Sequence, residues 1–130
     1  MNKEIKNWLA MVQYDLKTAD QMFQTGRYVY VIFMCHLAVE KALKALVSSE
    51  SNKIPPKTHD LIYLLSLASF ELPQNLLDFI GVINDAAIVT RYPEDLSKLV
   101  SSYPKNITQK YLINTRELIK CITKDFRLKK

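Results

Sequence analysis

With 130 residues, of which 48% are hydrophobic and 24% charged, the chain has the composition of one globular domain over residues 1–130, which excludes a disordered or collagen-like chain. Its two glycines form no glycine-rich phosphate loop. The net charge of +5 favours anionic partners such as RNA, nucleotides or an acidic protein, although this charge is also ordinary for a small domain.

The first helix is predicted over residues 3–24, because apolar side chains recur there at spacings typical of a helix. Asn2 is a suitable N-cap, and Gly26 is predicted to end the helix. The connection to the next apolar run is so short that the first two helices are expected to lie antiparallel.

The second helix is predicted from Tyr28 to about Ser48 and is apolar on nearly all sides in its first half. Such a helix must be covered on several sides, so we expect it at the centre of a bundle or in an oligomer interface. Its surplus of apolar surface favours a homodimer.

A polar stripe lies on this helix and consists of His36, Glu40, Lys41 and Lys44. The favoured interpretation is a solvated face with an ion pair between Glu40 and Lys44, which are four residues apart. In the alternative, Lys41 or Lys44 lines the same cleft as Arg91 and binds phosphate. We interpret His36 as a hydrogen-bonded core or interface histidine rather than as a ligand.

A short third helix is predicted after residues 49–57, which are rich in Ser and Asn and contain a proline pair. Thr58 is the predicted N-cap, with His59 and Asp60 in the first turn, where the helix dipole favours Asp60. Because a helix N-terminus also attracts phosphate, His59 is a candidate phosphate-binding residue.

The fourth helix is predicted to start at Pro73 and to end near Val89. Residues 90–106 contain two prolines and no sustained periodicity, so we expect a long loop. Loops of that length in small domains are usually functional or disordered. Thr108 is the predicted N-cap of a long final helix.

Arg91 and Tyr92 are the main candidates for binding a nucleotide or another anion. The Arg91 guanidinium can bind phosphate through two donors, and the Tyr92 ring can stack on a base. In the alternative interpretation, Arg91 only ends a helix and pairs with the helix dipole or with Glu94 and Asp95.

No metal site is expected, because the two histidines and two cysteines lack the spacing of metal ligands. We interpret Cys35 and Cys121 as small core side chains in a reducing cytosol. The N-terminal segment is too charged for a signal peptide, and no uncharged apolar run reaches the length of a membrane span. The expected location is therefore the cytoplasm.

Three motifs occur in order along the chain: A-V-E-K-A-L-K-A at residues 38–45, T-H-D-L at 58–61 and T-R-Y-P at 90–93. Together they resemble the HEPN domain family (higher eukaryotes and prokaryotes nucleotide-binding). The predicted elements form an all-α bundle of four long helices plus a short one, and the resemblance implies an up-and-down bundle of the nucleotidyltransferase substrate-binding-subunit type. It also implies a homodimer, and the roles of the family range from nucleotide binding to RNA cleavage.

The ribonuclease branch of the family carries an R-x(4–6)-H motif, which would require a histidine at positions 96 to 98 after Arg91. Those residues are Leu96, Ser97 and Lys98. The resemblance therefore implies the non-nuclease branch, without catalytic residues and without a cofactor other than ATP or another nucleotide as ligand. A small nucleotidyltransferase in a toxin–antitoxin-like pair is the implied partner. The alternative is a ribonuclease toxin with a degenerate or relocated site, in which His36 or His59 substitutes in space.

Overall fold

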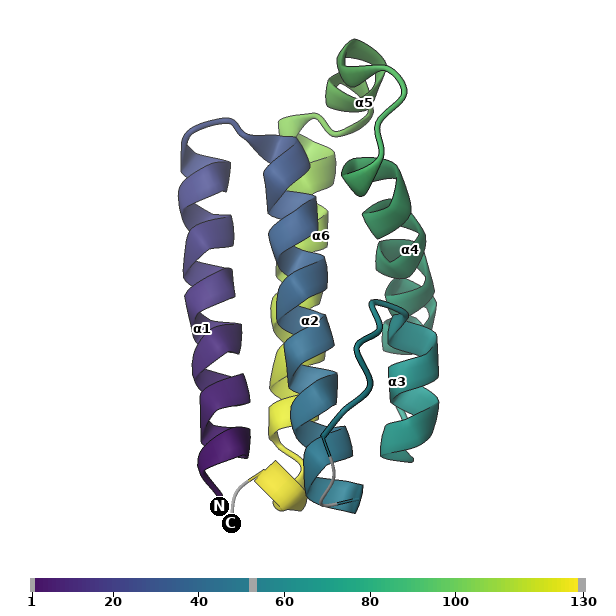
Figure 1. Cartoon of the computed structure of the whole chain (residues 1–130). Helices are drawn as coiled ribbons and strands as arrows, with labels where there is room; N and C mark the ends of the chain where they lie inside the picture. Colours follow the sequence, from purple (N-terminus) through teal and green to yellow (C-terminus); the bar gives the residue numbers. More distant parts are fainter. Residues whose placement is uncertain (1, 52–53, 129–130) are drawn as a thin grey trace.

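The structure is a computed structural model that describes residues 2–51 and 54–128. Helices account for most of these residues, and no strand occurs within them. The predicted all-α class is therefore confirmed. The elements are α1 (Lys3–Gln24), α2 (Tyr28–Ser51), α3 (Leu61–Ala68), α4 (Gln74–Arg91), α5 (Leu96–Ser102), α6 (Lys105–Thr123) and the 3₁₀ turn η1 (Phe126–Leu128) (Figure 1).

Helix α2 is the centre of the bundle. It contacts α1, α6, α3 and α4, and α1 and α4 flank it on opposite sides while α6 lies behind it (Figure 1). Its central position confirms the expectation from its apolar sequence. Within the described residues, no helix is long and apolar enough to cross a membrane.

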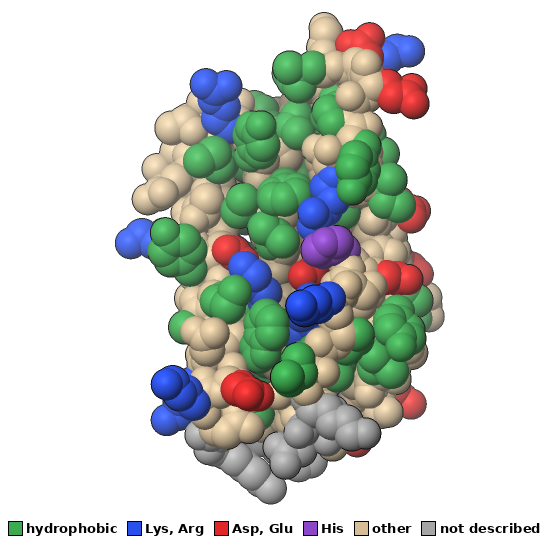
Figure 2. Space-filling view, viewed as in Figure 1, with side chains coloured by type: hydrophobic (Ala, Val, Ile, Leu, Met, Phe, Trp, Pro, Cys, Tyr) green, Lys and Arg blue, Asp and Glu red, His purple; other side chains and the backbone are tan. Residues whose placement is uncertain are grey.

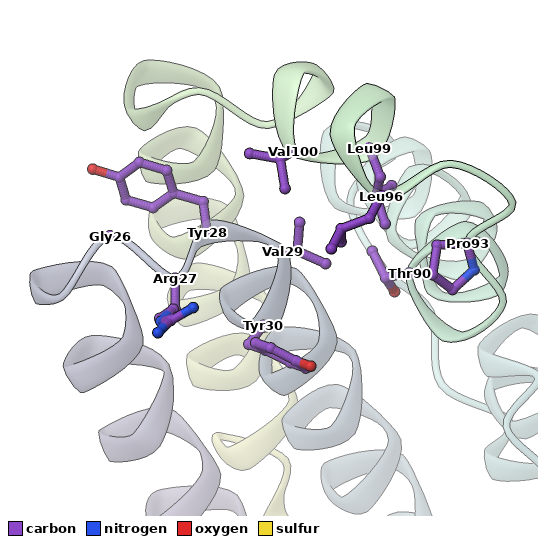
Figure 3. Close-up of a pocket in the computed structure, with 10 residues that line it drawn as sticks. All are labelled: Gly26, Arg27, Tyr28, Val29, Tyr30, Thr90, Pro93, Leu96, Leu99 and Val100. Atoms are coloured by element: carbon purple, nitrogen blue, oxygen red, sulfur yellow. The ribbon is translucent and has the colours of Figure 1, made fainter.

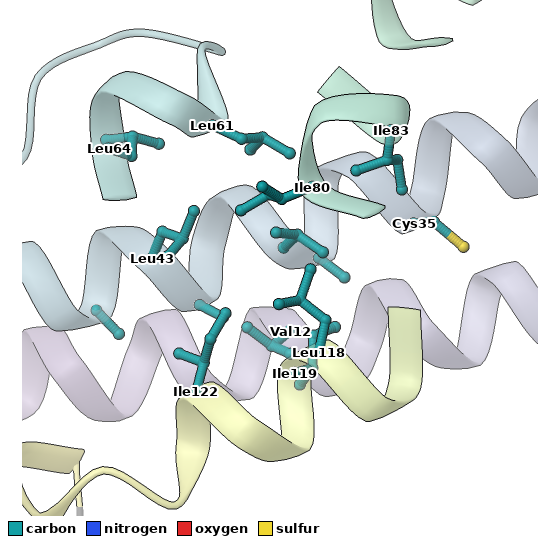
Figure 4. Close-up of a cluster of buried hydrophobic side chains, with 14 of the residues drawn as sticks. Val12, Cys35, Leu43, Leu61, Leu64, Ile80, Ile83, Leu118, Ile119 and Ile122 are labelled. Atoms are coloured by element: carbon teal, nitrogen blue, oxygen red, sulfur yellow. The ribbon is translucent and has the colours of Figure 1, made fainter. Parts of the chain in front are cut away.

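The core is formed by aliphatic side chains that each of the long helices contributes. Leu43 of α2 lies close to residues from α3, α4 and α6 in Figure 4. Burial of each large aliphatic side chain contributes about 1.5–3 kcal/mol to stability. The side chains with no exposed surface include Val12, Val31, Leu43, Leu61, Leu64, Ile80, Ile83, Leu118 and Ile122.

The connection between α1 and α2 follows the predicted local rules. The Asn2 side chain accepts a hydrogen bond from the backbone N–H of Ile5 at 2.9 Å, so Asn2 is the N-cap of α1. Gly26 has φ 77°, a left-handed conformation that a glycine adopts without steric cost. The two helices consequently turn back on each other and lie side by side (Figure 1).

The prediction that Thr58 caps the third helix is wrong. The N-cap is Asp60, whose carboxylate accepts hydrogen bonds from the backbone N–H groups of Ile62 and Tyr63. The Thr58 hydroxyl instead accepts from the backbone N–H of Asp60 at 3.2 Å. His59 therefore lies before α3 rather than in its first turn. Asp is at least as good an N-cap as Thr, so sequence alone did not decide between them.

The predicted long loop over residues 90–106 is also wrong. Helix α4 continues to Arg91, a short helix α5 follows with Asp95 as its N-cap, and α6 begins at Lys105 instead of at Thr108. Helix α5 is only 7 residues long and buries a single leucine, Leu99, so it is too short to show a helical period.

Candidate functional site

A pocket of about 280 Å³ lies between the start of α3 and the last turns of α4. We call it the Arg91 pocket. Its α4 wall consists of Asn84 and the residues three, four and seven positions after it, which lie on the same face of the helix. Figure 2 shows charged and histidine side chains gathered midway along one face of the molecule, among hydrophobic ones. The lining residues are His59, Asp60, Asn84, Ala87, Ile88, Arg91 and Tyr92.

Arg91 is the last residue of α4, and its guanidinium lies 4.8 Å from the centre of the Phe33 ring of α2. Its Nε and Nη2 atoms are buried and have no hydrogen-bond partner among the described residues. Within the described chain it forms no ion pair with Glu94 or Asp95, the partners proposed in the alternative interpretation. A buried donor without an acceptor is costly, so this guanidinium is suited to receive an acceptor from elsewhere.

Tyr92 and His59 are the two predicted site residues of the pocket that are exposed. Tyr92 follows α4 directly and is 77% exposed, so its ring is open to stacking. The His59 side chain is 62% exposed, but its Nδ1 lies 2.8 Å from Oε1 of Glu40. A carboxylate only accepts hydrogen bonds, so Nδ1 is the donor and Nε2 is left for another partner.

Glu40 lies beneath the pocket and binds two groups. Its second oxygen, Oε2, accepts a hydrogen bond from Nζ of Lys44 at 3.1 Å, which confirms the predicted ion pair. The prediction of a solvated face is wrong, because Glu40 is 4% and Lys44 8% exposed. Side chains from neighbouring elements cover this part of α2: His59 binds Glu40, and Lys44 lies 5.8 Å from the Trp8 ring centre.

His36 lies one turn before Glu40 on α2 and is 1% exposed. Its Nδ1 is 3.9 Å from Oε1 of Glu40, and neither ring nitrogen has a hydrogen-bond partner of good geometry within the described chain. Burial lowers the pKa of His36 to about 4, with a smaller lowering from Arg91 and an opposing effect from Glu40. The core location is confirmed, whereas the expected hydrogen bonds are absent among the described residues.

Lys41 lies outside this group of residues. Its Nζ binds Oδ2 of Asp15 on α1 at 2.6 Å, and neither Lys41 nor Lys44 lines the pocket. The fold therefore places His59, Arg91 and Tyr92 in the pocket. Glu40 and Lys44 lie next to its histidine, and Lys41 is bound to α1.

Two pocket residues, Asp60 and Asn84, were not among the predicted site residues. Asn84 Nδ2 donates to Oδ1 of Asp60 at 3.2 Å, and its own Oδ1 accepts from the backbone N–H of Leu61 at 2.9 Å. The only sequence feature that could have indicated Asn84 is its position seven residues before Arg91, two helical turns away on the same face.

A second pocket, of about 320 Å³, lies between the start of α2 and α5 (Figure 3). Its lining is mostly apolar: Val29 of α2 and Leu96 and Val100 of α5 point toward one another there. None of the candidate site residues lies in it. Among the described residues, no group of three potential metal ligands occurs.

Comparison with known proteins matches the model of the HEPN domain to residues 5–126. Two solved structures are similar along nearly their whole length. TT1696 from Thermus thermophilus has a TM-score of 0.79 at 20% identity, covering 95% of this chain and 98% of that one. ST0689, an archaeal HEPN homologue, has a TM-score of 0.75 at 17% identity, with the same coverage. At these identities the likeness shows the fold alone. No curated protein gave a significant match.

Proposed function

Because this chain belongs to the HEPN domain family, we propose that it is a nucleotide-binding module whose ligand phosphate is bound by Arg91. The observation that supports this proposal is the state of the Arg91 guanidinium, which borders a pocket while two of its nitrogens are buried without an acceptor. A phosphate supplies several strong acceptors, and arginine binds them through parallel hydrogen bonds.

The neighbouring residues suit the rest of a nucleotide. Tyr92 presents an exposed ring on which a base can stack, and His59 presents Nε2 for a hydrogen bond. The wall between Asn84 and Arg91 consists of Ala87 and Ile88, which offers an apolar surface to a base or ribose.

Thermal melts with AMP, ADP and ATP test this proposal. A ligand at about 100 times its dissociation constant adds about 2.7 kcal/mol of stability. For a domain of this size, that raises the midpoint by roughly 10 °C. We expect at least one nucleotide to do so, and Arg91→Ala to abolish the shift. Arg116→Ala is the matched control, since Arg116 lies on α6 and pairs with Asp20 on α1. If no nucleotide moves the midpoint, the proposal fails.

We propose further that the module works as a homodimer and with a small nucleotidyltransferase, in a toxin–antitoxin-like pair in the cytoplasm. Family membership supports the partner, and exposed apolar side chains around α4 and α5 support an interface. Sedimentation of the purified chain tests the dimer, and co-purification with a co-expressed nucleotidyltransferase tests the pair. The exposed apolar residues include Tyr30, Ile88, Val89, Tyr92, Leu96 and Val100.

A specific observation favours a second candidate, a ribonuclease with a relocated site. Glu40 binds Nδ1 of His59, so Nε2 can take a proton from a ribose 2′-hydroxyl while Arg91 stabilises the phosphate. Cleavage of single-stranded RNA that is lost in His59→Ala and in Arg91→Ala, but retained in Lys98→Ala, would establish it. RNA left intact by the wild-type chain would exclude it.

A further inference from the structure

The Arg91 pocket is lined by side chains of opposite charge. Asn84 and Arg91 are seven residues apart on α4, which separates them by about 10 Å along the helix axis. Asp60 lies at the Asn84 end, because Asn84 Nδ2 donates to its Oδ1 at 3.2 Å. Asp60 and Arg91 thus place a carboxylate and a guanidinium in the lining of the same pocket.

The carboxylate of Asp60 has one oxygen without a partner among the described residues. Its Oδ1 accepts from Ile62, Tyr63 and Asn84, whereas no hydrogen bond to Oδ2 is found within the described chain. Asp60 is exposed, so its negative charge faces the solvent that a ligand would replace.

Positive charge in the pocket is limited to one guanidinium and one histidine. Lys44 and Lys41 of α2 are paired with other carboxylates, Glu40 and Asp15, and Lys57, two residues before His59, is exposed and does not line the pocket. The lining thus contains Arg91 as its only permanently charged cation among the described residues, opposed by Asp60. A phosphate group carries a charge of about −1.5 to −2, which already exceeds the charge of Arg91, so each further phosphate adds negative charge near a carboxylate that no other permanent cation of the lining offsets.

The size of the pocket also favours a ligand with a single phosphate group. Its volume of about 280 Å³ is slightly below the range of roughly 300–1,000 Å³ typical for small-molecule sites. A phosphate at Arg91 with part of a nucleoside along Ala87 and Ile88 would occupy it. A triphosphate chain that extends inward would approach Asp60.

We propose that the Arg91 pocket selects ligands with a single phosphate group, such as a nucleoside monophosphate, and that Asp60 is the residue that disfavours di- and triphosphates. The inference rests on the proposed phosphate binding at Arg91 and adds the ligand class. Selection by repulsion is a common way to obtain specificity, because a carboxylate weakens the binding of the more highly charged ligand more than that of the less charged one.

Calorimetric titrations with AMP, ADP and ATP test the inference, with EDTA present so that no metal ion shields the phosphates. The variants are Asp60→Asn and the control Asp85→Asn, which removes the same charge from an exposed position of α4 outside the pocket. Asn is as good an N-cap as Asp, so α3 should keep its start.

For the wild-type chain we expect AMP to bind roughly tenfold or more tightly than ATP. Asp60→Asn should reduce that ratio to about threefold or less by tightening ATP, while Asp85→Asn should leave it unchanged. A wild-type chain that binds AMP and ATP equally, through Arg91, overturns the inference and leaves the proposed function intact. If Asp60→Asn does not change the ratio of AMP to ATP affinity, the inference is likewise overturned and the proposed function stays intact. Failure of all three nucleotides to bind overturns both.

Discussion

Nδ1 of His59 lies 2.8 Å from Oε1 of Glu40, so a largely exposed histidine before α3 is bound to a buried carboxylate in the middle of α2. The same carboxylate binds Lys44 through its other oxygen. A residue of the pocket is thereby bound to the central helix of the bundle.

Removal of the Glu40 carboxylate should destabilise the domain strongly. Glu40→Ala leaves the buried Lys44 ammonium without its partner, which typically costs about 3–5 kcal/mol. The double variant Glu40→Leu/Lys44→Leu should be more stable than Glu40→Ala, because no charge is then buried alone. Urea denaturation followed by circular dichroism measures both. Equal stabilities for Glu40→Ala and wild type would show that solvent or a rearranged partner compensates Lys44.

Stability should fall as the pH drops from about 6.5 toward 4. The pKa of His36 is about 4 in the fold, below its ordinary value of 6.5, so between these values the unfolded chain binds more protons. Protonation there favours unfolding, and the loss over this window approaches roughly 3 kcal/mol. Denaturation at several pH values measures the slope.

The matched variants for this pH dependence are His36→Leu and His59→Gln. His36→Leu removes the buried imidazole and should flatten the slope between pH 6.5 and 4, whatever its stability at pH 7. His59→Gln keeps His36 and should retain most of the slope. If the free energy of unfolding of His36→Leu depends on pH as steeply as that of the wild type, titratable groups other than His36 cause the loss of stability.

The N-cap of α3 can be located by comparing three variants. Asp60→Ala should lower stability by about 1 kcal/mol, because it removes the acceptor for the backbone N–H groups of Ile62 and Tyr63. Asp60→Asn should change stability little, and Thr58→Ala should cost less than Asp60→Ala. A larger loss for Thr58→Ala would instead support Thr58 as the cap.

Core and surface positions should differ sharply on truncation. Leu43→Ala removes a fully buried side chain at the centre of the bundle and should cost about 2–5 kcal/mol. Ile113 is 51% exposed on α6, so Ile113→Ala should cost less than Leu43→Ala by at least about 1 kcal/mol. Comparable losses at the two positions would indicate that Ile113 is covered, for instance by a second copy of the chain.

Much of the fold could be predicted from sequence because long helices repeat their pattern many times. Helices α1, α2 and α4, the central place of α2 and the caps Asn2 and Gly26 all follow from local spacing and backbone preference. Helix α5 and the true cap Asp60 could not be predicted. A two-turn helix shows no period, and two residues so close in sequence can both serve as caps.

The sequence by itself determined an all-helical bundle around α2 and the candidates Arg91, Tyr92 and His59. The tertiary structure decided which of these side chains share a pocket. It brought Asn84 and Asp60 beside Arg91, buried the pair of Glu40 and Lys44, and turned Lys41 toward α1. Helical periodicity gives the face on which a residue lies, whereas burial and partners depend on the helix packed against that face, which is distant in the chain.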